Sequence, residues 1–133
     1  MHKKILIWKL RSESGAHLEP VDFQPQPRTL DEGTRRLPQG GYTTLRTFKQ
    51  DRVLLLNDHF RRLEETAGLA GISLILDRQQ VRQALKQVQE EYPAQEKRIR
   101  IVIDLEEQPG CLYFLVEELV TPPPEEFHWG VRA

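Results

Sequence analysis

The residues in this sequence best suited to hold an anion lie at the start of one amphipathic segment. LLLNDHFRRLEETAGLAG, residues 54–71, carries His59, Arg61 and Arg62 directly after three leucines. The amides at a helix start carry about half a positive charge, and arginine adds a planar fork of donors that matches pairs of phosphate oxygens. The segment therefore has the chemistry of a local anion site.

The same residues leave a second interpretation open. Successive helical residues point about 100° apart, so Arg61 and Arg62 cannot both face one pocket. Both arginines could instead pair with Glu64 and Glu65 on a solvated face. A lone His59 in a first helical turn is more often a structural hydrogen-bonding group than a general base. On these residues alone, a solvated basic face is favoured.

Other groupings of catalytic or ligating residues are weak. The four histidines are scattered, and no pair of them has the spacing of metal ligands on a helix, so we expect no metal site. The sequence lacks a phosphate-loop pattern, a G-x-S-x-G pattern and the aromatic and basic pattern of RNA-binding sheets. Gly40 and Gly41 would let backbone approach a ligand, but paired glycines more often belong to a tight turn.

The chain length and the net charge limit the classes of protein to which this sequence can belong. The 133 residues fit one domain, and 19 basic against 20 acidic residues give a net charge of -1, so we expect neither a nucleic-acid nor a membrane partner. The single Cys111 suits a reducing compartment, and the apolar run around it predicts a buried strand. No apolar run approaches the roughly 20 residues of a membrane span, and no secretion signal is evident. We expect a soluble, cytoplasmic protein.

Strands are predicted where residues alternate or are β-rich. Residues 3–23 contain an apolar run, a Ser/Gly turn and a second extended segment, and residues 42–56 contain YTTLRTF, a polar KQDR turn and VLLL. Each of these regions predicts a hairpin. CLYFLVEEL is a further strand, and KRIRIVIDL places four apolar side chains on one face: Ile99, Ile101, Ile103 and Leu105.

Helices are predicted between these strands. A short helix begins at Thr29, with Glu32 at capping-box spacing, and stops at Pro38. The first long helix has Asn57 or Asp58 available as its N-cap. The second starts near Asp77 and has a clear apolar stripe, formed by Val81, Leu85, Val88 and Tyr92. We therefore expect an α+β fold, a two-layer single domain over residues 1–133 with a mostly antiparallel sheet covered by two main helices.

The order of these motifs resembles the N-terminal domain of the class IV aminotransferases. GGYTTLRTF, a polar turn, VLLLNDHFRRLEETAGLAG, a second helix and RIRIVID follow one another as in that family. Its members are the fold-type-IV pyridoxal-phosphate enzymes, which include branched-chain aminotransferases, D-amino-acid aminotransferases and aminodeoxychorismate lyases. The resemblance is best over residues 37–119, and its most specific part is H-x-x-R-L at residues 59–63.

The resemblance implies roles for three residues. The arginine of H-x-x-R-L binds the phosphate of pyridoxal phosphate in this family, which points to Arg62 and leaves Arg61 on the surface. The aromatic residue at the head of the preceding strand lines the substrate pocket, which points to Tyr42. Arg46 is expected in the same pocket, and the T-T-x-R form that ends in it is more similar to the lyase-type members. An aminodeoxychorismate lyase-like enzyme is therefore an alternative to an aminotransferase acting on an amino acid or amino-substituted acid.

Two features depart from the family pattern. Many members have an arginine and a glycine at the end of the strand that corresponds to RIRIVID, where this chain has Asp104, Leu105 and Glu106. Family catalysis also needs a Schiff-base lysine and a glutamate that pairs with the pyridine nitrogen, and both belong to a second, C-terminal domain. None of the lysines in this chain corresponds to that lysine, so we assign no catalytic residue here.

The sequence after residue 119 looks interrupted rather than finished. Three consecutive prolines are followed by FHWGVRA, which is more like the start of a strand than a chain end. We therefore expect a fragment that is inactive alone, whose partners are the missing lysine-bearing domain of the same protein and a second copy in a homodimer. The alternative is a complete non-catalytic module that oligomerises or binds anions.

Overall fold

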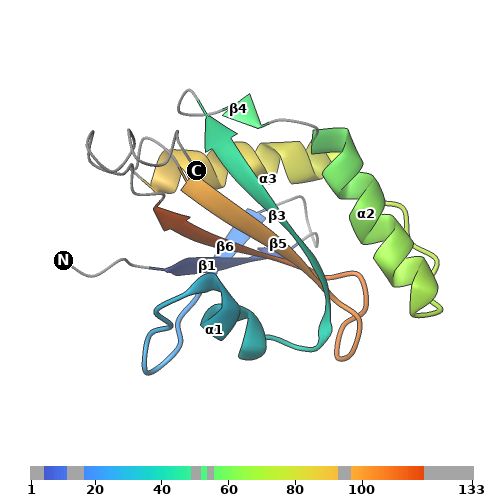
Figure 1. Ribbon diagram of the computed structural model, residues 1–133, viewed down its shortest axis with the longest axis horizontal. Helices are drawn as coiled ribbons and strands as arrows, with labels where there is room; N and C mark the ends of the chain where they lie inside the picture. Colours follow the sequence, from blue (N-terminus) through green and yellow to red (C-terminus); the bar gives the residue numbers. More distant parts are fainter. Residues whose placement is uncertain (1–4, 12–16, 49–51, 54–55, 93–96, 119–133) are drawn as a thin grey trace, which may run out of the picture.

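A computed structural model describes residues 5–11, 17–48, 52–53, 56–92 and 97–118. The described strands are β1 (Leu6–Arg11), β2 (His17–Val21), β3 (Gly40–Phe48), β4 (Arg52–Val53), β5 (Lys97–Asp104) and β6 (Leu112–Glu118). The helices are α1 (Leu30–Arg35), α2 (Leu56–Leu69) and α3 (Arg78–Glu91). Figure 1 shows the strands side by side with α2 and α3 packed along them.

The strands form one antiparallel sheet in the order β2-β1-β6-β5-β3-β4. The long β3 pairs with β5 from Gly40 to Arg46 on one side, whereas β4 pairs only with Thr47 and Phe48 on the other. Both predicted hairpins are present, and Leu54 and Leu55 of the strand predicted for the second one lie outside the described residues. The outer edge of β3 from Gly40 to Arg46 therefore has no strand partner among the described residues.

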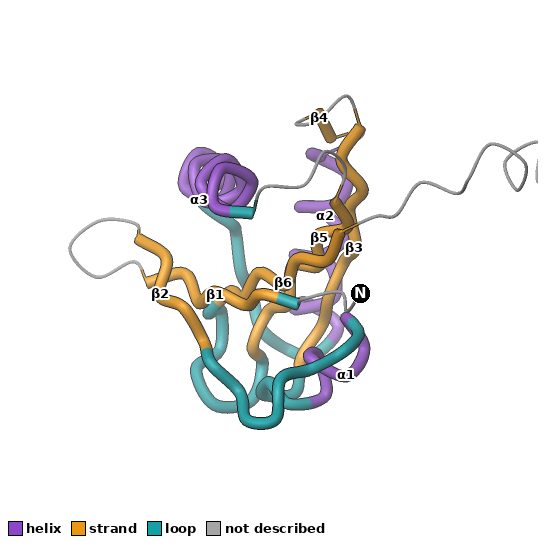
Figure 2. Tube along the Cα trace, turned by 90° about the vertical axis from the view of Figure 1, so that its left-hand side faces the viewer, coloured by secondary structure: helices purple, strands orange, loops and turns teal. Residues whose placement is uncertain are grey.

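Helices α2 and α3 cover one face of the sheet. Figure 2 shows both helices on one side and α1 on the other. The covered face holds the main core, in which Phe60, Leu63 and Val88 of the helices are fully buried against Ile101 and Phe114 of the sheet. The expected α+β fold with two main helices is confirmed.

Short helix α1 closes a smaller core on the opposite face. Thr29 caps it by accepting a hydrogen bond from the Glu32 amide at 3.0 Å, as its spacing predicted. Leu30 packs there with Ile7 and Leu115. Alternate residues of β5 and β6 consequently face two different cores, which explains why β6 is almost continuously apolar.

Candidate functional site

The first turn of α2 is attached to α3. The helix begins at Leu56, so the expectation that Asn57 or Asp58 caps it was wrong. Asn57 instead accepts hydrogen bonds from two arginines of α3, its carbonyl oxygen from Arg78 at 3.4 Å and its side-chain oxygen from Arg82 at 2.5 Å. Both guanidinium groups lie over the Phe60 ring, 5.5 and 5.7 Å from its centroid. These contacts fix the start of the helix against its neighbour.

His59 connects α2 to β3. Its Nδ1 lies 2.7 Å from the Thr43 hydroxyl oxygen, and the tautomer decides which group donates. Burial lowers the pKa of His59 below its ordinary value, and the positive charge of Arg62 lowers the pKa further, against an opposing effect of Asp58. The structure therefore favours a neutral imidazole beside Arg62.

The two adjacent arginines of α2 differ in their partners. Arg61 forms an ion pair with Asp58 one turn earlier. The Arg62 side chain is exposed, and within the described part of the chain its guanidinium makes no ion pair or hydrogen bond. The predicted pairing with Glu64 is wrong, because that carboxylate binds Arg78 of α3 at 2.9 Å. Arg62 thus presents an uncompensated positive charge.

Arg62 belongs to a stripe of α2 that runs along β3. His59 lies one turn before it and contacts Thr43, while Thr66 lies one turn after it against Gly41. A Cβ atom built on Gly41 would come within 2.3 Å of the Thr66 methyl carbon. This glycine therefore permits close packing of helix on strand rather than the tight turn suggested by the sequence.

Tyr42 and Arg46 lie on the other face of β3. Thr43 and Leu45 face α2 and the main core, so the alternation of the strand directs Tyr42, Thr44 and Arg46 to the opposite side. Tyr42 is 52% exposed, and Arg46 is also exposed. The residues assigned from the sequence therefore flank the open edge of β3, with Arg62 on one side and Tyr42 and Arg46 on the other.

Arg100 of β5 was not assigned a role from the sequence, yet it contacts this site. Its Nε donates to the Thr44 hydroxyl at 3.0 Å, and its Nη1 donates to Asp31 of α1 at 2.7 Å and to Thr34 at 3.2 Å. Its guanidinium carbon lies 4.2 Å from the centroid of the Tyr42 ring. The available signal was its position between Ile99 and Ile101 in the strand, where a charged side chain needs partners.

Asp104, which the sequence analysis singled out as a departure from the family pattern, has a structural role. Its buried carboxylate accepts hydrogen bonds from the amides of Glu106, Glu107 and Gln108 at 2.8 to 2.9 Å. This carboxylate folds the turn that joins β5 to β6, and Gly110 completes the turn with a φ of +97°. This position therefore holds an anchor for the loop.

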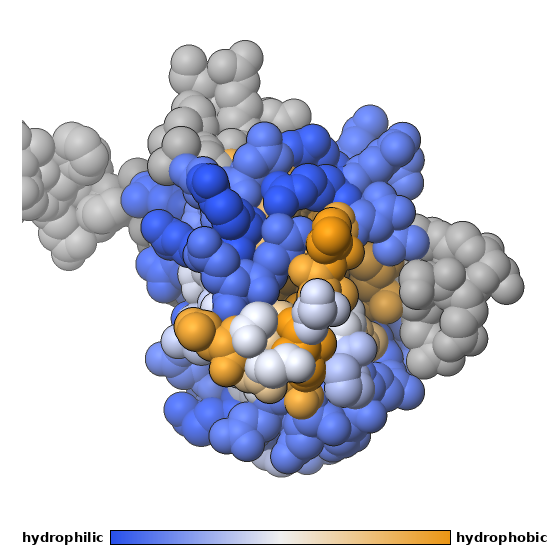
Figure 3. Space-filling model, turned by 90° about the vertical axis from the view of Figure 1, so that its right-hand side faces the viewer, coloured by the Kyte–Doolittle hydropathy of each residue, from blue (hydrophilic) through white to orange (hydrophobic). Residues whose placement is uncertain are grey.

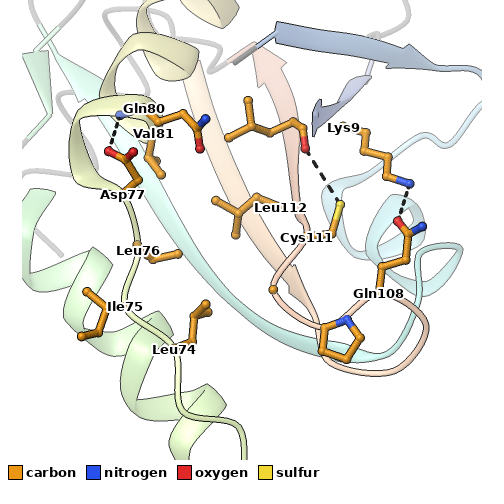
Figure 4. Close-up of a pocket in the computed structure, with 13 residues that line it drawn as sticks. Lys9, Leu74, Ile75, Leu76, Asp77, Gln80, Val81, Gln108, Cys111 and Leu112 are labelled. Atoms are coloured by element: carbon orange, nitrogen blue, oxygen red, sulfur yellow. Dashed lines mark hydrogen bonds between the residues drawn. The ribbon is translucent and has the colours of Figure 1, made fainter. Parts of the chain in front are cut away.

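A separate cleft of about 600 Å³ lies between the α2–α3 connection and this turn. Figure 4 shows Lys9 hydrogen-bonded to Gln108 at 2.8 Å and Asp77 capping α3 through the Gln80 amide. Cys111 is half-buried here and precedes β6, so its expected place inside a buried strand was wrong. The charged groups of this cleft are engaged with the protein itself.

Across the part of the chain that the structure describes, no group of three or more His, Cys, Asp or Glu side chains is arranged to hold a metal ion. In the same part, no helix has both the length and the apolar character required to span a bilayer.

Fold and site together define an α+β domain with an uncompensated arginine and an exposed tyrosine flanking one open strand edge. The sequence model of the family described as Amino-transferase class IV matches residues 40–129, a region that contains all three assigned residues. The chain belongs to the class IV aminotransferase family. A search of curated proteins gave no match.

The chain is similar in fold to solved structures that include the following two. A Thermotoga maritima protein provisionally named a branched-chain amino acid aminotransferase superposes with a TM-score of 0.61 and 24% identity, covering 90% of this chain and 39% of its own. A hypothetical aminotransferase from Mycobacterium tuberculosis, in its PLP-bound form, gives a TM-score of 0.55 and 20% identity, covering 96% of this chain and 43% of its own. This chain therefore spans about two fifths of the length of these structures.

Proposed function

We propose that this chain is the N-terminal, cofactor-facing domain of a pyridoxal-phosphate enzyme that acts on an amino acid or amino-substituted acid. Arg62 binds the cofactor phosphate, and Tyr42 and Arg46 line the substrate pocket. The observation that carries the proposal is the unpaired Arg62 guanidinium, held beside β3 in the H-x-x-R-L segment of a family member.

The groups around Arg62 fit a phosphate. A guanidinium that has no carboxylate partner can offer its paired donors to phosphate oxygens without first breaking an ion pair. The neighbouring Arg61 is already neutralised by Asp58, which directs the anion to one side chain. His59 and Thr66, one turn away on either side, fix the helix against β3 and so fix the position of the Arg62 backbone.

Bound pyridoxal phosphate supplies an electron sink for bonds at the amino-bearing carbon. The residues of this chain would hold and orient that group. Arg62 would retain the phosphate, while the exposed face of Tyr42 and the charge of Arg46 would contact the substrate across the edge of β3. We assign no proton transfer to these residues.

The proposed enzyme also needs a second domain and a second copy of the same protein. The related solved structures are more than twice as long as the region they share with this chain. We infer that the cofactor lysine and the carboxylate for the pyridine nitrogen come from the remainder of a longer enzyme, which works as a homodimer. The lyase-type reaction remains the alternative outcome, because Tyr42 and Arg46 alone do not select between amino transfer and elimination.

The experiment that tests the proposal compares two adjacent arginines in the complete gene product. Arg62→Ala removes the unpaired guanidinium, whereas Arg61→Ala removes one that is paired with Asp58 on the same exposed turn. Because a hydrogen bond to a charged group contributes about 1.5 to 3 kcal/mol, Arg62→Ala should weaken pyridoxal-phosphate affinity by roughly 10- to 100-fold. Cofactor titration followed by absorbance measures the change.

Arg61→Ala should leave the affinity within about twofold, since an exposed ion pair contributes little. Equal affinity of Arg62→Ala and the unmodified protein would remove the phosphate role of Arg62. Absence of any cofactor binding in the unmodified gene product would instead favour the non-catalytic module.

A further inference from the structure

The Arg100 side chain is held in place by the hydrogen bonds that it donates to two structural elements, β3 and α1. Its side chain is only 11% exposed although it projects from the face of β5 opposite the main core. Thr44 of β3 holds its Nε, and Asp31 and Thr34 of α1 hold its Nη1. Three acceptors within 3.2 Å leave the planar guanidinium little freedom to rotate.

Tyr42 rests on this fixed group. The guanidinium carbon lies 4.2 Å from the ring centroid, well within the distance at which a cation is attracted to an aromatic face. Tyr42 is nevertheless 52% exposed, so much of the ring remains available to a ligand. An exposed aromatic side chain on a sheet ordinarily exchanges between rotamers, and the stacked guanidinium favours one of them.

The contacts of Arg100 argue against a direct ligand role. A substrate carboxylate would have to displace Asp31 or the two threonine hydroxyls to reach the bound nitrogens, and the side chain is almost covered. Asp31 can stay paired while Tyr42 contacts a ligand, since the two occupy different parts of the guanidinium. The pKa of Asp31 is lowered by its hydrogen bond to Arg100 and by the positive charge of the same group.

We propose that Arg100 is a positioning residue, which holds the Tyr42 ring on the open edge of β3 in the orientation that the substrate pocket uses. The statement that the substrate pocket uses this orientation of Tyr42 rests on the proposed function. The statement that Arg100 restrains the ring rests only on the contacts between the two side chains. Helix α1 takes part as well, because its Asp31 and Thr34 accept hydrogen bonds from Nη1 of Arg100.

The test compares two arginines of β5. Arg100→Lys keeps the charge but loses the planar fork, and Arg98→Lys is the matched control on the same face of the same strand. Arg98 pairs with Glu117 at 3.1 Å. The complete gene product is labelled with ring-¹³C tyrosine, and Tyr42→Phe assigns the Tyr42 signal among the three tyrosines of this chain. Far-ultraviolet circular dichroism confirms that each variant is folded.

The Tyr42 ring signals should move toward those of an unrestrained tyrosine in Arg100→Lys and stay in place in Arg98→Lys. Asp31→Asn is a second variant at a side chain that is 72% exposed, so the fold should be retained if Arg100→Lys unfolds. It should produce a smaller shift in the same direction. Unchanged Tyr42 signals in the folded variant, or equal shifts in Arg98→Lys, would overturn the proposal.

A functional measurement separates this inference from the proposed function. Loss of one pre-ordered side chain should raise KM for the amino substrate about 2- to 10-fold in Arg100→Lys, with kcat and pyridoxal-phosphate affinity nearly unchanged. A loss of cofactor affinity as large as that of Arg62→Ala would make Arg100 a ligand and contradict the proposal. Shifted Tyr42 signals in a protein that binds no cofactor would support the restraint by Arg100 and reject the proposed function.

Discussion

At the scale of single residues, His59 links stability to pH. Its pKa in the folded protein is lowered below the ordinary value of 6.5, first by burial and then by Arg62. The unfolded chain therefore takes up a proton at this residue more readily than the folded chain does. His59 should not oppose folding above pH 6.5, and it should destabilise the fold progressively as the pH falls through 6.5 to its lower folded pKa.

This linkage predicts a difference between the unmodified protein and His59→Gln. Glutamine cannot titrate and can still hydrogen-bond to Thr43. Urea unfolding at pH 7.5 and 5.5 should show the unmodified protein losing more stability on acidification than the variant, because only the unmodified protein gains a proton at this position when it unfolds. Identical losses would mean that the folded-state pKa of His59 is not lowered. The other histidines are present in both proteins and cancel in the comparison.

The residue scale also shows which site contacts could be predicted from sequence. Arg62 could be assigned from the sequence because the residues of H-x-x-R-L are neighbours along the chain, and its phosphate role stays a prediction. Arg100 could not be found this way, since Thr44 and Asp31, which hold it, lie 56 and 69 positions away. Asp104 was noticed only as a departure from the family pattern, and its role became clear when its carboxylate was seen to bind three amides of the following turn.

At the scale of elements, the periodicity of apolar residues predicted the middle of each helix and strand better than its ends. The stripe of α3 and the alternation of β5 each followed from apolar side chains that face a single core, and both are confirmed. The start of α2 was wrong because Asn57 binds arginines 21 and 25 positions later instead of capping its own helix. Local capping rules cannot anticipate partners supplied by another helix.

At the start of β3, the close approach of Gly40 to β5 predicts a loss of stability when a side chain is added there. A Cβ atom on Gly40 would lie 1.8 Å from the Ile103 carbonyl oxygen of β5, which is backbone and cannot rotate away. Gly40→Ala should therefore destabilise the protein by about 1 to 3 kcal/mol or more, the usual cost of overpacking. Gly68→Ala is the control within α2, because a Cβ atom there meets nothing within 4 Å. It should stabilise by up to about 1 kcal/mol through helix propensity.

Chemical denaturation of both variants measures this contrast. Because Gly40 adjoins Gly41 and the Tyr42 end of β3, its variant should also reduce cofactor affinity, while Gly68→Ala should not. Equal stability of the two variants would show that β3 can move away from β5 at its first residue, and the close approach would then not be required.

At the scale of the whole molecule, one apolar surface has no covering element among the described residues. Leu69 at the end of α2 is 91% exposed and Ile75 in the α2–α3 connection is 87% exposed, with Ile72 and Leu74 partly buried between them in the sequence. Figure 3 shows apolar side chains gathered on this side of the molecule and surrounded by hydrophilic ones. Phe127 and Trp129, the aromatic residues of the FHWGVRA segment, lie outside the described residues.

This surface predicts self-association of the 133-residue chain. Burying a leucine or isoleucine side chain contributes about 1.5 to 3 kcal/mol, so covering Leu69 and Ile75 on each of two copies favours contact between them at high concentration. Leu69→Ser with Ile75→Ser should weaken association in sedimentation by about tenfold or more, whereas Gln83→Ser with Gln87→Ser, at exposed positions of α3, should not. A strictly monomeric unmodified chain at high concentration would contradict this expectation. If the complete gene product also associates but is insensitive to the Leu69 and Ile75 changes, this surface is covered within that protein, as expected if the remainder of a longer enzyme packs here.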